Sequence, residues 1–322
     1  MGESLGLDAV GVARAEPYDD TERHIRDRRA RGLFGRMRFT MARPEVSCHP
    51  ELLLAGARTV VSAALCYYAP EPELTPGRGR LPRYTRSDGY AELREKLDAL
   101  GRAIGGEYRV LVDTNHHVDR EAAARSGVGF YGKNTMVITR RHGSWVVLGT
   151  LVTTVELDAT PPLATDCGSC TRCIDACPTG ALDEPGVLDA TRCLSYWTQA
   201  AEPVPREYRA ALGAQLYGCD ICQEVCPWNR GVEKRRHDAE PDAGAHVDLV
   251  EWLEADDLAA RYERLFVPRN DVRWLRRNAL VAAGNVGDER TRASVERYAS
   301  GDDELLAEHA QWALERMGER CR

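Results

Sequence analysis

The sequence predicts a multidomain protein that combines α/β and α+β architecture, and three observations carry that prediction. In residues 1–160, apolar runs of strand length alternate with segments of helical periodicity. Residues 161–232 hold eight of the chain's eleven cysteines, and residues 245–322 have the apolar spacing of helices. At roughly 100–200 residues per domain, a chain of 322 residues allows two or three domains. We therefore expect one domain in each of these three ranges.

The first range should form a layered α/β domain. Strands are expected where the chain is apolar over strand length, at residues 6–13, 58–65 and 108–112. Helices are expected at residues 20–42, which are rich in arginine, and at 89–105 and 117–126. Two further strands, at residues 136–139 and 145–155, are predicted to pair as a hairpin through the turn at 141–144.

The third range contains a weak internal repeat. Residues 278–287 resemble residues 309–318, at an offset of 31 residues, and alanine and leucine recur in both. That period is typical of paired-helix solenoid units. Two units are few for an independent solenoid, so we expect them to lean on the body of the protein. The polar and charged residues 231–245 should form the linker before them.

Composition and charge limit the possible classes of protein. The chain is 43% hydrophobic and 29% charged, as globular proteins usually are. Its N-terminus lacks a basic stretch followed by an apolar run, and no apolar run approaches the ~18 residues that span a bilayer. We expect a cytoplasmic protein with no membrane partner. The net charge of −7 argues against coating nucleic acid by bulk charge but leaves room for a local basic face.

The spacing of the cysteines is the most informative motif. One group reads Cys-x-x-Cys-x-x-Cys-x-x-x-Cys-Pro from Cys167, and a second, incomplete group begins at Cys219. This is the bacterial ferredoxin pattern, in which the fourth cysteine ligates the other 4Fe–4S cluster. We therefore predict a ferredoxin-like domain with two clusters. The predicted ligands are Cys167, Cys170, Cys173 and Cys226 for one cluster, and Cys177, Cys193, Cys219 and Cys222 for the other.

Structural zinc is the alternative for the same cysteines, because it also uses paired Cys-x-x-Cys motifs. Zinc sites need neither a third closely spaced cysteine nor the Cys-Pro ending, so the cluster interpretation is favoured. Cys48, Cys66 and Cys321 remain, and we interpret them as buried apolar side chains or an exposed tail thiol.

Further motifs extend over nearly the whole chain. They are Val112-Asp113-Thr114, Asp119-Arg120, Gly132-Lys133-Asn134-Thr135, Gly143-Ser144-Trp145, Pro178-Thr179-Gly180-Ala181-Leu182, Arg192-Cys193-Leu194-Ser195-Tyr196 with Thr198-Gln199, and Leu216-Tyr217-Gly218-Cys219-Asp220. With these motifs the chain resembles the bacterial epoxyqueuosine reductases. The resemblance implies a cobalamin between the N-terminal domain and the cluster domain, and a C-terminal HEAT-like helical domain. It also implies reduction of epoxyqueuosine at the wobble position of tRNA, from epoxide to alkene with loss of water.

The chain departs from the pattern of that family at three places. Asp88-Gly89-Tyr90 stands where the family usually has Asp-Tyr-His, and Asn115-His116-His117 stands where an apolar pair is common. Ala200-Ala201 stands where a basic residue often follows Thr-Gln. Because the resemblance implies cobalamin bound without a protein histidine on cobalt, we do not expect His116 or His117 to be a ligand.

The implied reduction consumes two electrons and two protons. Cofactors must carry the electrons, and a positioned acid must protonate the departing oxygen. Asp113 is the candidate acid because it follows a predicted strand, and a carboxylic acid in an apolar pocket can stay protonated near neutrality. The alternative is that Asp113 caps the helix that follows it.

Cofactor contacts are expected from other residues of the same motifs. Lys133 and Asn134 follow a glycine in a predicted turn and could contact corrin amides or substrate oxygens, although a solvated turn is the alternative. Residues after Cys193 either line the active site or only cap and pack locally. The expected cofactor-binding residues are Asp119, Arg120, Lys133, Asn134, Ser195, Tyr196, Thr198, Gln199 and Asp220.

Four basic clusters suggest a focused phosphate-binding surface, although any one of them could be a solvated face. They contain Arg23, Arg26, Arg28, Arg29, Arg31, Arg36 and Arg38; Arg78, Arg80, Arg83 and Arg86; Lys234, Arg235 and Arg236; and Arg273, Arg276 and Arg277. We expect them, with residues 246–322, to hold the anticodon stem-loop of a tRNA through its shape and phosphates, with one base splayed into the pocket.

The expected further partner is an external electron donor such as a flavodoxin or ferredoxin, and the protein is expected to be a monomer. The alternative function is a cobalamin and iron–sulfur reductase of a small molecule, similar to reductive dehalogenases, which would not need the helical tail. A plain electron-transfer module would not need residues 1–160.

Overall fold

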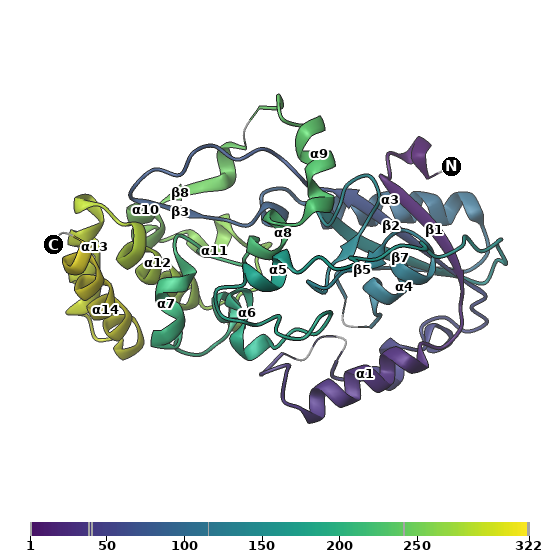
Figure 1. The fold of residues 1–322 in the computed structure, drawn as a ribbon, viewed down its shortest axis with the longest axis horizontal. Helices are drawn as coiled ribbons and strands as arrows, with labels where there is room; N and C mark the ends of the chain where they lie inside the picture. Colours follow the sequence, from purple (N-terminus) through teal and green to yellow (C-terminus); the bar gives the residue numbers. More distant parts are fainter. Residues whose placement is uncertain (1, 38, 40, 115, 241, 321–322) are drawn as a thin grey trace.

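The computed structural model describes residues 2–37, 39, 41–114, 116–240 and 242–320. Figure 1 shows an elongated molecule with an N-terminal sheet at one end, C-terminal helices at the other and the cysteine-rich segment between them. The described strands are β1 (Ala9–Arg14), β2 (Thr59–Cys66), β3 (Arg78–Arg80), β4 (Tyr108–Val112), β5 (Phe130–Tyr131), β6 (Val137–Ile138), β7 (Val146–Thr153) and β8 (His246–Asp248).

Helices occur throughout the described residues and dominate the C-terminal end. The α-helices are α1 (Asp19–Ala30), α2 (Pro44–Ser47), α3 (Gly89–Ile104), α4 (Asp119–Arg125), α5 (Arg172–Asp175), α6 (Leu194–Gln199), α7 (Arg206–Leu212), α8 (Ile221–Glu224), α9 (Arg230–Arg235), α10 (Leu249–Glu254), α11 (Leu258–Arg261), α12 (Arg273–Val286), α13 (Glu289–Ala299) and α14 (Glu304–Arg320). Short 3₁₀ turns are η1 (Glu3–Leu5), η2 (Pro50–Leu52), η3 (Arg83–Thr85), η4 (Ala190–Arg192), η5 (Pro227–Asn229), η6 (Ala243–Ala245) and η7 (Pro268–Asn270).

The N-terminal sheet has the strand order β1-β2-β7-β4, and each neighbouring pair is antiparallel. Its central strands β2 and β7 are buried along nearly their whole length, which explains their almost unbroken apolar sequences. Leu93 and Leu97 of α3 share a hydrophobic cluster with Val61 on one face, whereas Ala122 of α4 shares a cluster with Val60 on the other. The layered α/β prediction is confirmed.

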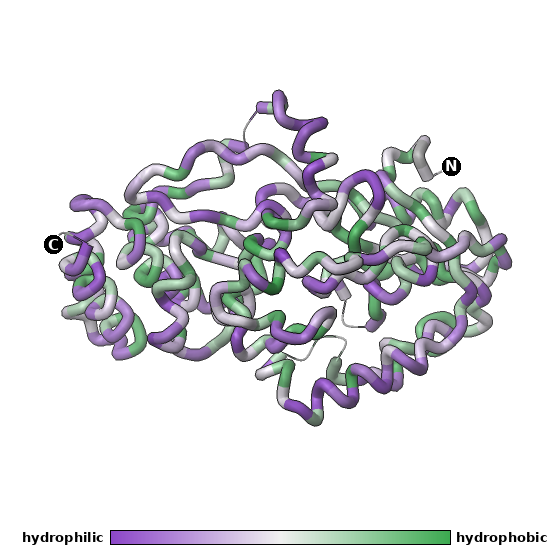
Figure 2. Tube along the Cα trace, in the orientation of Figure 1, coloured by the Kyte–Doolittle hydropathy of each residue, from purple (hydrophilic) through white to green (hydrophobic). Residues whose placement is uncertain are grey.

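Three predicted elements differ from the structure. The helix expected at 20–42 ends at Ala30, because glycines with left-handed backbone follow at Gly32 and Gly35, whose φ angles are 73° and 53°. The expected hairpin is wrong: β6 pairs with β5, and β7 lies between β2 and β4. The expected linker begins with α9, which is mostly hydrophilic in Figure 2, as is α1.

The C-terminal repeat is confirmed as two helices in contact. Residues 278–287 lie mostly on α12 and residues 309–318 lie on α14, and both helices contribute to one hydrophobic cluster. The helices approach so closely at Gly284 that a Cβ there would lie 2.7 Å from the Trp312 ring and 2.9 Å from Ala313. This close approach explains a glycine in the middle of a helix.

Equivalent positions of the two repeats hold the cysteine-rich segment. Asn278 donates from Nδ2 to the carbonyls of Thr198 and Leu216, at 2.8 Å each. His309, 31 residues later, accepts the backbone N–H of Val204 at its Nε2, at 3.2 Å. The helices therefore lean on the body of the protein, as the repeat predicts.

Candidate functional site

The eight predicted cluster cysteines lie on or beside the short helices α5 and α8 and at the start of α6, between the sheet and the C-terminal helices (Figure 1). Burial raises the pKa of the Cys226 thiol, and the nearby thiols of Cys167, Cys173 and Cys170 raise it further. Cys226 lies 49 residues after Cys177 in the sequence. The effect of the other thiols on its pKa indicates that it lies beside the first cysteine group in space. This arrangement fits the predicted ligand set of the first cluster.

The second predicted set gathers in the same way. Burial raises the pKa of Cys219 to about 12, and among the nearby thiols Cys193 and Cys177 raise it further. Burial raises the pKa of Cys222 well above its ordinary value, with further contributions from Cys219 and Cys193. Cys173 of the first set also acts on Cys222, so the two sets are neighbours.

The donor chemistry around these thiols fits iron–sulfur clusters. The backbone N–H of Lys133 donates to Cys167 Sγ at 3.4 Å, and the N–H of Ala181 donates to Cys177 Sγ at 3.3 Å. Such N–H donors stabilise the negative charge of cluster-bound thiolates. Among the described residues, no three His, Cys, Asp or Glu side chains converge on a single metal ion. A 4Fe–4S cluster does not require such convergence, because its four irons are separate.

Asp113 lies at the end of β4, in left-handed backbone with φ of 50°. Its side chain is exposed to the space in front of the sheet, yet neighbouring protein atoms desolvate the carboxyl and raise its pKa, while Arg94 opposes that rise. The helix that follows, α4, begins at Asp119 and has Val118 as its N-cap. The alternative reading of Asp113 as the cap of that helix is therefore wrong.

Asp119 is a second carboxyl beside Asp113. Its Oδ1 accepts a hydrogen bond from Thr150 Oγ1 at 3.4 Å. Burial raises the pKa of Asp119 to about 8, and the charge of Asp113 contributes to the rise. The neighbouring Arg120 points to the turn after β5, where its Nη1 donates to the carbonyl of Thr135 at 3.1 Å.

Four tyrosines that the sequence reasoning missed lie near the candidate carboxyls Asp113 and Asp220. Burial raises the pKa of Tyr90 and of Tyr217, and in both cases the charge of Asp113 adds to the effect. Tyr217 hydrogen-bonds to Tyr84, while Tyr67 and Tyr84 each respond to the charge of Asp220. Tyr90 and Tyr217 both lie in stretches that the family resemblance had singled out, so a signal for them was available.

Tyr217 shows that the N-terminal sheet and the cysteine-rich segment lie close together. It lies two residues before the predicted cluster ligand Cys219, but its hydroxyl is influenced by Asp113 of the N-terminal sheet. A group bound here would contact both the candidate acid and the wall that carries the second cluster. Tyrosine rings and hydroxyls close to Asp113 are the kind of groups that suit a large, flat macrocycle with amide groups on its rim, such as a corrin.

The residues after Cys193 hold Tyr217 and the loops around it. Gln199 accepts a hydrogen bond from the Tyr217 hydroxyl at 3.1 Å and donates to the Ser195 carbonyl at 3.1 Å. Thr198 Oγ1 accepts the N–H of Gly218 at 2.8 Å. Tyr196 is 8% exposed, and its hydroxyl accepts the N–H of Arg36 at 3.2 Å. Thr198 and Tyr196 thus fix neighbouring loops.

Lys133 and Asn134 turn toward the cluster loops. Lys133 Nζ donates to the carbonyls of Gly168 at 2.7 Å and Cys170 at 3.0 Å. Asn134 is 3% exposed and donates to the Cys222 carbonyl at 3.4 Å. The solvated-turn alternative is therefore wrong, and both side chains join the sheet domain to the cysteine-rich segment.

Asp220 belongs to a buried ionic network. It is 2% exposed and accepts the backbone N–H of Arg83 at 2.9 Å. Glu71 forms ion pairs with Arg83 and Arg86, each at 3.0 Å, and also with Arg80. These arginines of the second basic cluster are occupied inside the protein, so the prediction that they form a phosphate-binding face is wrong.

The fourth basic cluster does not form one surface either. Arg277 is fully buried, and its guanidinium donates to the carbonyls of Trp197 and Ala200 at 2.7 Å each and to that of Glu202. Its predicted contact with RNA phosphate is wrong, because the side chain supports α6 instead. Arg38, in the first cluster, lies outside the described residues.

The two histidines after Asp113 are placed differently. His116 is exposed, whereas His117 is 1% exposed and its ring lies 5.6 Å from the Tyr18 ring. Burial lowers the pKa of His117 to about 4. His117 thus has a packing role under α4, while the expectation that neither histidine binds cobalt stays a prediction.

Comparison with known proteins adds to this geometry. The family model described as epoxyqueuosine reductase QueG matches residues 48–114, and the 4Fe–4S double cluster binding domain model matches residues 166–229. An epoxyqueuosine reductase of Lactococcus garvieae (strain Lg2) is 32% identical over 100% of this chain and 95% of its own length. The chain belongs to the epoxyqueuosine reductase family.

Other epoxyqueuosine reductases agree over the full length. The enzyme of Bacillus subtilis (strain 168) is 32% identical over 98% of this chain and 86% of its own length. A solved epoxyqueuosine reductase from Streptococcus thermophilus superposes with a TM-score of 0.88 and 30% identity, covering 99% of this chain and 89% of the other. A solved epoxyqueuosine reductase with an epoxyqueuosine-modified tRNA-Tyr stem-loop gives a TM-score of 0.87 and 31% identity, covering 98% and 88%.

These findings establish the cysteine-rich segment as a 4Fe–4S double cluster binding domain within a mixed α/β chain. No helix in the described residues is long and apolar enough to cross a membrane.

Proposed function

We propose that the protein reduces epoxyqueuosine at the wobble position of tRNA to queuosine, converting the epoxide to an alkene with loss of water. The observation that carries the proposal is the position of Asp113, whose carboxyl acts on Tyr217 next to the cluster ligand Cys219. An acid and a proposed electron route thus lie close together, in a chain that matches epoxyqueuosine reductases over 95% and 86% of their length.

The proposed domain organisation follows the sequence ranges. Residues 1–160 would form the catalytic cobalamin-binding domain, residues 161–232 the ferredoxin-like domain, and residues 245–322 a short HEAT-like domain. The proposed cluster ligands are Cys167, Cys170, Cys173 and Cys226, and Cys177, Cys193, Cys219 and Cys222. The close approach of the two cysteine sets supports electron transfer between the clusters.

We place the proposed cobalamin in the space between Asp113 and Tyr217. Bound there, cobalamin supplies a strongly reducing cobalt centre for two-electron chemistry. Ser195 and Gln199 are half-buried on the cluster side and would contact its rim, whereas Asp119 and Arg120 border the sheet side. Lys133, Asn134, Tyr196, Thr198 and Asp220 would act by fixing the loops that form this space.

Asp113 would donate a proton to the departing oxygen. Desolvation raises its pKa, so a larger share of the carboxyl is protonated near neutrality than for a free aspartate. The left-handed backbone at this residue directs the chain away from β4 and leaves the carboxyl facing open space. A solved Bacillus subtilis epoxyqueuosine reductase has an aspartate-bearing catalytic loop swung out of the active site, which supports a mobile acid in this family.

The proposed partners are the anticodon stem-loop of tRNA and an external electron donor such as a flavodoxin or ferredoxin. We also propose that the protein acts as a monomer in the cytoplasm.

The direct test is turnover of an epoxyqueuosine-containing RNA stem-loop by anaerobically reconstituted protein with a chemical reductant. The expected product nucleoside is lighter by one oxygen atom and carries an alkene. Product formation that requires both clusters and cobalamin would support the proposal. Reconstituted protein that binds cobalamin but neither retains nor alters the stem-loop would instead favour a small-molecule substrate.

A further inference from the structure

Two exposed phenylalanines meet at the edge of the proposed site. Phe39 is 42% exposed and Phe266 is 55% exposed, and their ring centroids lie 6.1 Å apart in an edge-to-face arrangement. They come from opposite ends of the sequence, one from the loop after α1 and the other from the segment before α12. Large apolar rings are usually buried, so an exposed pair of them calls for an explanation.

Described residues close to each ring in the sequence pack against the rest of the protein. Met37 and Met41, on either side of Phe39, pack against different hydrophobic clusters, one around Tyr196 and the other around Tyr18. Leu265, next to Phe266, is 6% exposed. Described neighbours of both rings are thus packed into the protein, while the two rings themselves are exposed.

Both segments are tied to the wall of the proposed site. The Phe266 carbonyl accepts a hydrogen bond from the Tyr217 hydroxyl at 3.0 Å. On the other side, the N–H of Arg36 donates to the Tyr196 hydroxyl, and a Cβ on Gly35 would lie only 2.8 Å from that oxygen. The rings thus lie next to the residues that border the substrate space.

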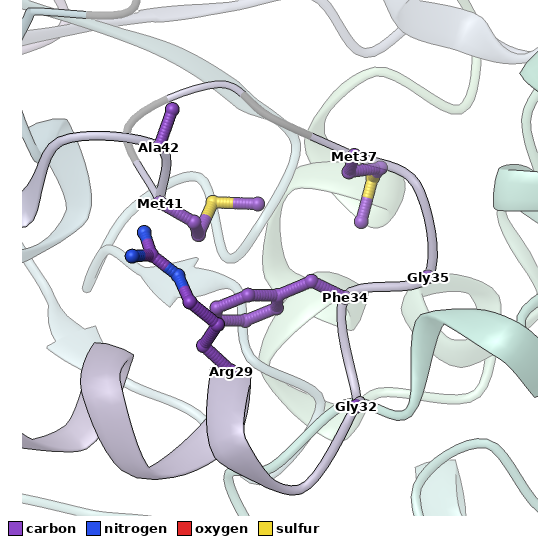
Figure 3. A pocket seen from close by; sticks show the side chains of 7 residues that line it. All are labelled: Arg29, Gly32, Phe34, Gly35, Met37, Met41 and Ala42. Atoms are coloured by element: carbon purple, nitrogen blue, oxygen red, sulfur yellow. The ribbon is translucent and has the colours of Figure 1, made fainter.

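The loop of Phe39 also forms a pocket of about 370 Å³ (Figure 3). The close-up shows Phe34, Met37 and Met41 around it, with the guanidinium of Arg29 at its edge. Soft apolar side chains beside a cation suit a flat base attached to a phosphate. The exposed Arg269 follows Phe266 by three residues and adds positive charge on the opposite side.

We propose that Phe39 and Phe266 form a stacking site for an unpaired nucleobase of the tRNA anticodon loop, beside the base that enters the active site. The inference rests on the proposed function. Single-stranded RNA is recognised by splaying bases onto aromatic rings, and such stacking tolerates different base identities. The site would fix the position of the loop, so that the modified base is directed between Asp113 and Tyr217.

The test uses the reconstituted holoprotein and a fluorescently labelled RNA stem-loop that contains epoxyqueuosine. Phe39→Ala and Phe266→Ala should each weaken binding about tenfold, since stacking on an aromatic ring contributes ~1–3 kcal/mol per base. Phe39→Trp and Phe266→Trp should bind as well as the wild type. Leu52→Ala is the matched control, because Leu52 is also a strongly exposed apolar side chain, at 61%.

Two further measurements make the result specific. The slope of binding affinity against salt concentration should stay unchanged in the alanine variants, because stacking releases no counterions. A 2-aminopurine base placed beside the modified nucleotide should be quenched on binding to the wild type and less so with the alanine variants. Cluster and cobalamin spectra should match those of the wild type.

The failures of the two proposals can be separated. If the wild type reduces the stem-loop while both alanine variants bind it within twofold of the wild type, the stacking site is wrong and the proposed function stands. If the wild type neither binds nor reduces the stem-loop, the proposed function itself is wrong. A reduced salt slope in the alanine variants would also overturn stacking, because it would indicate lost phosphate contacts.

Discussion

Asp113 and Asp119 are two carboxyls in different surroundings at the same site. Asp113 faces the open space, whereas Asp119 is hydrogen-bonded to Thr150 beneath α4. Desolvation raises the pKa of both, and the charge of Asp113 raises that of Asp119 further. The reduction needs two protons, and in the proposed function Asp113 would donate the one that reaches the departing oxygen.

We expect Asp113→Asn to slow turnover at least ~100-fold, because general acid catalysis is worth about 10²–10⁴-fold. The variant should bind cobalamin, both clusters and RNA normally, since asparagine has the same shape and tolerates left-handed backbone well. Single-turnover rates of the reconstituted variant check this.

Asp113→Ala provides the control for stability. It should lower the melting temperature slightly, because alanine is strained at a φ of 50°. Near-normal turnover by Asp113→Asn would show that Asp113 is not the proton donor.

The raised pKa of Asp119 predicts how the free energy of unfolding depends on pH. It is raised to about 8 from an ordinary 3.8, so between these pH values the native state holds a proton that the unfolded state has lost. The free energy of unfolding should therefore decrease through this group as pH rises from about 4 to about 8, and not outside that window.

Asp119→Asn should lose less thermal stability than the wild type when pH is raised from about 5 to about 8, because the titrating group is gone. Melting curves of the holoproteins at these pH values measure the difference. Asp302→Asn serves as the control, since Asp302 is exposed. Parallel pH profiles for the wild type and Asp119→Asn would contradict the raised pKa.

At the level of elements, the cluster loops and α6 depend on residues distant in sequence. Cys193 stands at the start of α6, 16 residues after Cys177, yet its nearest thiol partners include Cys177 and Cys219. As a proposed cluster ligand, Cys193 would therefore join a cluster to α6.

Cys193→Ala should lose about half of the roughly eight irons expected for two cubes. Iron analysis and absorbance after anaerobic reconstitution measure this loss. Cys66→Ala is a matched control at a cysteine outside the predicted ligand sets. Full iron content in Cys193→Ala would remove Cys193 from the ligand set.

Arg277 of α12 supports α6 from the other side. Arg277→Met should lower the free energy of unfolding by at least about 3 kcal/mol, because three carbonyls lose their donor at ~1–3 kcal/mol each. Arg276→Met, which removes a contact with one half-exposed carbonyl, should cost much less. Equal destabilisation of the two variants would argue against the support of α6 by Arg277.

Periodicity and spacing predicted most elements, but not their pairing. The leucines of α3 and the apolar runs of β2 and β4 mark these elements within a residue or two. The two-residue strand β6 has too little pattern to show that it pairs with β5. Antiparallel order likewise depends on contacts between segments far apart in sequence.

Only part of the candidate site could be predicted, for a similar reason. Cysteine spacing reports chemistry directly, so the ligand sets could be read from it. A run such as Arg273, Arg276 and Arg277 looks basic, but the sequence does not show that Arg277 is buried against backbone carbonyls. The sequence could not show that Tyr90 and Tyr217 lie near each other, because they come together only across the interface between the sheet and the cluster segment.

The whole molecule is one connected assembly in which the C-terminal helices have a structural role. β8 pairs with β3 of the N-terminal half, and Asn278 holds both Thr198 and Leu216 in place. His246 also contacts Glu71 at 3.0 Å, in the ionic network around Asp220. Removing the tail would therefore break contacts that hold the cysteine-rich segment.

Deleting residues 246–322 should cause loss of the second cluster, whose ligands Cys193 and Cys219 flank the segments that α12 supports. The deletion also exposes a hydrophobic core that includes Leu216 and Tyr217, so the truncated protein should aggregate or bind less than its full iron. Iron content and size-exclusion profile of the truncated chain measure both effects.

Glu304→Lys with Arg316→Glu provides a full-length comparison, because both residues lie on α14 and have half-exposed or exposed side chains. This exchange alters surface charge but leaves the buried contacts of α12 intact, so iron content should be normal. If the truncated chain instead keeps both clusters and loses only RNA affinity, the tail is a separable RNA-binding unit. In that case the hydrogen bonds from Asn278 and Arg277 would contribute little to the cluster segment.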